Sequence, residues 1–176
     1  MKIFKHKAFT IVWTILRVWL GYKWLTAGVQ KLTDPAWVGS EAGTAIQGFF
    51  QGTIARSTGQ YATVPGWYAG FIERVAMPLS KVFTYLIPVG ETFVGISLIL
   101  GALTILGLLC GALMNFNYLL AGSGGVNIIM YTVAIILLAA GAAAYYIGLD
   151  KVLIFPILRR YFKFIPEKPE KTGLNR

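Results

Sequence analysis

The chain has 176 residues, of which 56% are hydrophobic, whereas soluble domains average about 45–50%, so the composition argues against a water-soluble globular protein. The formal net charge is +9, but the basic residues gather at the two ends beside apolar segments, which is typical of membrane topology signals and not of nucleic-acid binding. A single cysteine, Cys110, and a single histidine, His6, exclude an internal disulfide and give no indication of a metal or haem site.

Four apolar segments are long enough to cross a hydrocarbon core about 30 Å thick, which takes about 20 helical residues. The first spans about 8–29, follows the basic residues Lys2, Lys5 and Lys7, and is ended by Asp34 and Pro35. The other three segments are expected at about 82–100, 103–121 and 126–148, with tight turns at 101–104 and 122–125.

The segment 33–81 is a polar insertion between the first two apolar segments. Its stretches 43–56 and 67–81 have helix-compatible patterns rich in aromatic residues, which suits helices lying at a membrane surface. Basic residues precede the first span and follow the fourth, so both termini are expected in the cytoplasm.

These features predict an all-α fold, a polytopic bundle of four transmembrane helices in the cytoplasmic membrane with a helical extracytoplasmic insertion. One membrane domain covers 1–160, and a basic, flexible cytoplasmic tail covers 161–176.

Three charged residues lie inside expected spans. Lys23 points to another face of the first helix and is expected to snorkel outward, whereas Arg17 and Glu91 are the two clear cases of a buried charge. Each such group costs at least about 2.5–3.5 kcal/mol on insertion, so it normally faces the bundle interior and marks a functional site. At about 1.5 Å per residue both come near the middle of the membrane, where they could pair.

One face of the first helix carries Arg17, Gly21, Trp24, Gly28 and Lys31. Small residues at such spacing let a neighbouring helix approach closely, and the charges indicate that this face points inward. The same glycines could instead serve self-association into a homo-oligomer.

Asparagines at 115, 117 and 127 add polar groups between the midplane and the outer surface. Together with Trp24 and Lys31 they predict a polar pocket open to the outside, suited to an anion or to a quinone-like ring on which Trp24 or Tyr118 could stack. The alternative interpretation is a buried structural ion pair with interhelical hydrogen bonds.

Three motifs carry a family resemblance: Arg17-x3-Gly21-x6-Gly28-x2-Lys31-Leu32, Gly90-Glu91-x3-Gly95-x2-Leu98-x-Leu100-Gly101, and Asn115-Phe116-x5-Gly122 followed by Gly124-Gly125. They resemble the DoxX/DoxD family of small four-helix membrane proteins, whose members include the membrane subunit of thiosulfate:quinone oxidoreductase. The resemblance covers about 8–148 and implies a second oxidoreductase subunit or a soluble redox protein as partner.

We therefore expect a subunit of a quinone-linked membrane oxidoreductase, with a quinone as co-substrate. Glu91 would relay a proton, and Arg17 would hold Glu91 in place or stabilise an anion. The ligand would be contacted by Asn115, Asn117, Trp24, Lys31 and Asn127. The alternative is a non-enzymatic scaffold that holds soluble redox or stress-response proteins at the bilayer through the basic tail. A permease ranks last because no inverted repeat is visible.

Overall fold

Every regular element is a helix in the residues that a computed structural model of the chain describes, which are 7–144, 146–154 and 156–157. The long helices are α1 (Lys7–Thr33), α4 (Ser80–Leu100), α5 (Thr104–Leu120) and α6 (Val126–Ala140). The shorter ones are α2 (Thr44–Ala55), α3 (Gly66–Phe71) and the turns η2 (Ile72–Ala76), η3 (Gly141–Ala143) and η4 (Asp150–Ile154). The all-α prediction is confirmed for this part of the chain.

The four long helices coincide with the four apolar segments, with one correction. The fourth was expected to reach residue 148, but α6 ends at Ala140 because Gly141 has a φ of +55°, which a continuing helix cannot accommodate. Among the described helices, one, α4, is both long and apolar enough to cross a membrane, while α5 and α6 are apolar but shorter.

α1 and α4 pack closely along glycines. A methyl group added at Gly95 would lie 2.5–2.6 Å from the backbone of Leu25, and one added at Gly21 would lie 2.9 Å from the backbone of Ile99. One added at Gly28 would meet Thr92 in the same way. The glycine face of α1 is thus used inside the bundle, and its contacts set the register of α1 against α4.

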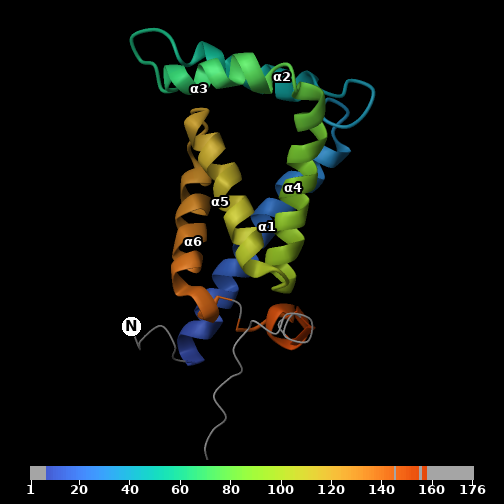
Figure 1. Cartoon of the computed structure of the whole chain (residues 1–176), viewed down its shortest axis with the longest axis vertical. Coiled ribbons are helices and arrows are strands. Elements are labelled where there is room, and N and C mark those ends of the chain that lie inside the picture. Colours follow the sequence, from blue (N-terminus) through green and yellow to red (C-terminus); the bar gives the residue numbers. More distant parts are fainter. Residues whose placement is uncertain (1–6, 145, 155, 158–176) are drawn as a thin grey trace, which may run out of the picture.

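α2 and α3 lie across one end of the bundle as a lid (Figure 1), while the start of α1 and η4 lie at the opposite end. Three hydrogen bonds fix the lid and the preceding loop to the long helices. Arg56 donates to the carbonyl of Ala121 at 3.0 Å, the Tyr68 hydroxyl to the backbone carbonyl of Asn117 at 3.1 Å, and Thr84 to the carbonyl of Trp37 at 2.6 Å.

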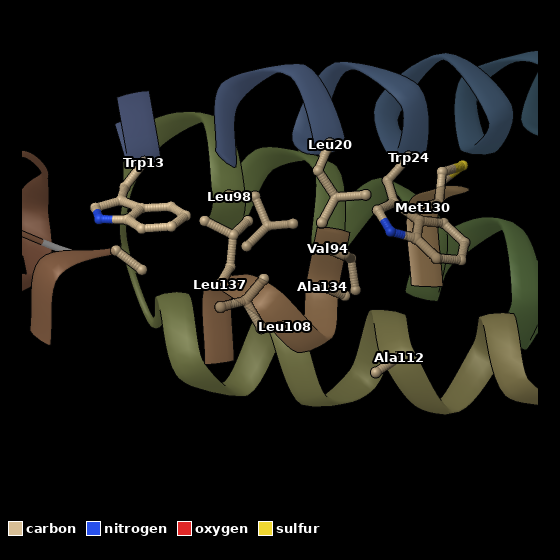
Figure 2. Packing of buried hydrophobic residues seen from close by; sticks show 11 residues of the cluster. Trp13, Leu20, Trp24, Val94, Leu98, Leu108, Ala112, Met130, Ala134 and Leu137 are labelled. Carbon is tan, nitrogen blue, oxygen red and sulfur yellow. The ribbon is translucent and has the colours of Figure 1, made fainter. Parts of the chain in front are cut away.

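An apolar layer fills the middle of the bundle, between Trp13 and Trp24 (Figure 2). Its side chains come from all four long helices and are fully buried: Leu20, Val94, Leu98, Leu108, Ala134 and Leu137. This layer separates the lid end of the bundle from the end that holds η4.

The outer surfaces of the long helices are also apolar. Exposed side chains include Ile11, Ile15 and Val18 on α1, Leu86, Val89 and Phe93 on α4, Leu109, Leu113 and Phe116 on α5, and Ile128, Ile129 and Ile136 on α6. Two charged residues, Arg17 and Glu91, are meanwhile only 2% and 1% exposed. This distribution is the reverse of that in a soluble protein, where charged residues are almost never fully buried and large apolar patches are rare.

Candidate functional site

Glu91 of α4 receives hydrogen bonds from two other helices. The Lys31 ammonium lies 2.7 Å from Oε2 and 3.0 Å from Oε1, and the Tyr118 hydroxyl donates to Oε1 at 2.6 Å. Lys31 keeps 23% of its side chain exposed while Glu91 keeps 1%. Both carboxylate oxygens therefore have charged or polar donors, which a buried carboxylate requires.

The register of α1 and α4 brings this pair together. Gly28 lies against Pro88 and Thr92, so the next turn of α1 places Lys31 level with Glu91. α1 continues to Thr33, just before Pro35, and the Asp34 carboxylate then accepts a hydrogen bond from the backbone of Ala36 at 2.9 Å. The position of Lys31 is therefore set by the close contact at Gly28 and by the continuation of α1 as far as Thr33.

Aromatic rings surround the ion pair. Trp24 stacks on Tyr118 with ring centroids 6.5 Å apart, and Phe49 of the lid meets Tyr118 edge-on at 6.1 Å. The Lys31 ammonium also lies 5.4 Å from the centroid of the Trp37 ring, within the range of a cation–π contact.

These groups line a partly open cavity of about 390 Å³ beneath the lid, which we call the Glu91 cavity. Its lining comprises Lys23, Trp24, Ala27, Lys31, Trp37, Ile46, Phe49, Glu91, Tyr118, Ser123, Val126, Asn127 and Met130. Cavities that bind small molecules typically measure about 300–1,000 Å³ and combine apolar walls with a few polar groups, as this one does.

The cavity offers a specific set of interactions. An ammonium carries three N–H bonds, and Lys31 directs two of them to Glu91, so a third can be donated to a ligand. The Lys31–Glu91 pair is neutral overall and Lys23 adds one further cation to the lining, so the cavity favours a ligand that accepts hydrogen bonds, either neutral or anionic. Flat aromatic walls favour a planar ring.

Of the predicted site residues, Trp24, Lys31, Glu91 and Asn127 line the Glu91 cavity. The Asn127 amide also donates to the carbonyl of Ser123 at 3.1 Å, across the turn between α5 and α6. Their proposed roles in binding and proton transfer stay predictions.

Arg17 does not pair with Glu91, which corrects that hypothesis. It lies about 21 Å from Lys31 along α1, at 1.5 Å per residue, and the buried side chains of Leu20 and Trp24 come between them. Its Nη1 donates to the carbonyl of Ala144 at 2.9 Å, and its guanidinium packs against Gly101 and Gly148. A side chain in place of either glycine would leave the guanidinium no room. Arg17 therefore belongs to a different cluster from the cavity.

Asp150 is the centre of that second cluster. Its carboxylate accepts hydrogen bonds from the backbone of Leu103 at 2.6 Å and of Thr104 at 2.9 Å, which caps the start of α5, and it interacts electrostatically with Arg17. Leu103 has a φ of +55°, which costs a leucine about 1–2 kcal/mol, and these hydrogen bonds help to hold it there. The cluster is a structural tie between α1, the turn between α4 and α5, and η4.

The other two asparagines lie outside the lining of the Glu91 cavity. The Asn117 amide donates to the carbonyl of Leu113 at 2.8 Å, and its Oδ1 accepts from the Tyr68 hydroxyl at 3.2 Å. Asn115 is fully buried, and neither of its amide atoms has a partner among the residues described. An unpaired buried amide costs about 1–3 kcal/mol per group, so this position is not explained by stability.

Tyr118 was predicted only to stack on a bound ring, and its hydrogen bond to Glu91 was not foreseen, while Phe49 and Trp37 were not among the predicted site residues. Phe49 and Trp37 belong to the insertion, and nothing in their local sequence indicates that the lid lies over the end of the bundle.

Comparison of the chain with models of protein families, with curated proteins and with solved structures finds no match.

Proposed function

We propose that the chain is an integral membrane protein whose four long helices all cross the bilayer. The support is the apolar outer surface of α1, α4, α5 and α6, combined with charged residues buried inside. α5 and α6 are short for a span, but a bundle adapts to such a mismatch by local thinning of the bilayer. With basic residues before α1 and after α6, the lid faces outside and both termini face the cytoplasm.

Within this protein the Glu91 cavity binds the ring of a quinone, and the chain acts as the quinone-binding subunit of a membrane oxidoreductase. The observation that carries this proposal is the contact of Lys31 and Tyr118 with a fully buried Glu91 in an aromatic cavity of about 390 Å³. A quinone is neutral and planar, and its carbonyl oxygens accept hydrogen bonds. The resemblance of the motifs to the DoxX/DoxD family agrees with this role.

The chemistry divides between this chain and a partner. Reduction of a quinone to a quinol consumes two electrons and two protons, and a second redox protein supplies the electrons. Lys31 donates a hydrogen bond to the carbonyl oxygen as it gains negative charge, and Glu91 relays protons because its carboxylate contacts both Lys31 and Tyr118.

Binding of a tail-less benzoquinone to the purified protein tests the proposal. Lys31→Gln should weaken binding by about tenfold or more, because it removes a charged donor worth about 1.5–3 kcal/mol. Tyr118→Phe should weaken it less, and Lys81→Gln, at an exposed lysine outside the cavity, should leave it unchanged. The melting temperature of each variant establishes that it is folded. The absence of saturable binding to the native protein would refute the proposal.

Topology is tested separately by cysteine labelling in intact cells. In a Cys110→Ser background, Gln60→Cys in the lid should react with a membrane-impermeant maleimide from outside. Lys151→Cys, at the opposite end, should react only after permeabilisation. Equal labelling of both positions in intact cells would contradict the four-span topology.

The scaffold alternative depends on the basic tail at 161–176, which lies outside the described residues. No specific observation in the structure favours it, whereas the Glu91 cavity favours a small ligand. A permease needs a polar route through the bundle, and the fully buried apolar layer at Leu20, Leu98 and Leu137 occupies that route.

A further inference from the structure

A second cavity of about 260 Å³ lies between α4, α5 and the lid, and we call it the lateral cavity. Its lining comprises Phe49, Phe50, Tyr68, Phe71, Ile72, Ala76, Phe83, Leu86, Ile87, Leu113, Met114, Asn117 and Tyr118. Almost all of these side chains are apolar.

The polar groups in this lining are already engaged with one another. The Tyr68 hydroxyl donates to Oδ1 and to the backbone carbonyl of Asn117, and the Tyr118 hydroxyl donates to Glu91. A guest in the lateral cavity therefore meets hydrocarbon surface, which suits an alkyl or isoprenoid chain and not a polar molecule.

The two cavities share a wall. Phe49 and Tyr118 line both, and their edge-to-face contact at 6.1 Å forms the partition between them. Phe49 is partly exposed and belongs to the lid, whereas Tyr118 is held by its hydrogen bond to Glu91. Rotation of the Phe49 ring would join the two spaces.

The lateral cavity reaches the apolar outer surface of the bundle. Leu86 of α4 and Leu113 of α5 line it and are 57% and 63% exposed, on the faces proposed to contact lipid. A hydrocarbon chain that occupies the cavity can therefore continue into the bilayer between α4 and α5.

We propose that the ligand is an amphipathic lipid quinone, with its ring in the Glu91 cavity and the first part of its hydrocarbon chain in the lateral cavity. This inference rests on the proposed function and adds the class of ligand and its route, which runs from the membrane and past Phe49.

The experiment compares two probes, a tail-less benzoquinone and the same ring with a ten-carbon chain, on the detergent-solubilised full-length protein. Ala76→Leu adds bulk inside the lateral cavity, where Ala76 is 2% exposed. This variant should bind the chain-bearing quinone at least about fivefold more weakly, the cost of overpacking an occupied site, and should bind the tail-less quinone as the native protein does.

Leu113→Trp provides a second variant at the mouth of the cavity, in case Ala76→Leu does not fold. Its matched control is Leu109→Trp, one turn away on α5, 52% exposed and outside the lining. Of these two variants, only Leu113→Trp should weaken binding of the chain-bearing quinone relative to the tail-less quinone. If the tail-less probe binds and neither cavity variant discriminates between the probes, the inference is overturned and the proposed function stands. If neither probe binds the native protein, both are overturned.

Discussion

Replacing Lys31 with methionine tests whether Glu91 depends on this lysine. Methionine has a similar length and keeps the apolar stem, but it leaves the carboxylate, 1% exposed, with Tyr118 as its remaining donor. Breaking a buried ion pair from one side costs about 3–5 kcal/mol. For a chain of this size, that cost corresponds to a melting temperature lower by about 6–20 °C.

Glu91→Gln should cost less than Lys31→Met. The lysine left behind is 23% exposed and reaches water, so its charge is not stranded. In the double variant neither charge is left unpaired, and about 1–3 kcal/mol of the Lys31→Met loss should be recovered. Thermal unfolding of the four proteins in one detergent measures this coupling.

A parallel cycle with Arg17→Met and Glu91→Gln provides the control. Arg17 lies about 21 Å from Lys31 along α1 and has other partners, so these two losses should add to within about 0.5 kcal/mol. Coupling between Arg17 and Glu91, with none between Lys31 and Glu91, would refute the reasoning.

Three further predictions concern the fold. Gly95→Ala should destabilise the protein by about 1–2 kcal/mol because its methyl group meets the backbone of α1, whereas Gly90→Ala on the same helix should be neutral or stabilising; melting temperatures in detergent compare the two variants. Leu103→Gly should raise stability by about 1 kcal/mol by relieving its positive φ, measured in the same way, and a loss would show that the leucine side chain matters more. Burial raises the pKa of Tyr68, so the folded state holds the hydroxyl proton more tightly than the unfolded state does, and stability should fall as pH rises above about 10. In unfolding curves measured over a pH series, Tyr68→Phe should make this fall less steep. An unchanged slope in that variant would contradict the prediction.

The helices could be predicted because their signals are local. The apolar runs located the starts of all four long helices to within about two residues, and the positive-φ glycines at 101, 122 and 125 fall at the predicted turns. The end of the fourth helix could not be located, because Gly141 lies in an alanine-rich run that is typical of a continuous helix. A single glycine in a helix is tolerated, so its presence alone does not mark the end of one.

The partners of the buried charges could not be predicted, because they depend on register between helices. The prediction that Arg17 and Lys31 lie on one inward face of α1 was correct, but nothing in the sequence says which of the two lies level with Glu91. The contact between Gly28 and Thr92 decides it in favour of Lys31. Asp150 lies beyond the expected spans, and only the folded chain brings it back to Arg17.

The most direct test of the central claim is to locate the bound ring by photo-crosslinking. An azido-substituted benzoquinone is illuminated on the native protein, and the modified residues are identified by mass spectrometry. We expect modification in α2 around Phe49 and in α5 around Tyr118, and we expect it to be suppressed by excess unlabelled quinone and reduced in Lys31→Gln. Suppressible modification confined to the opposite end of the bundle, around Arg17 and Asp150, would contradict the assignment of the Glu91 cavity as the quinone site.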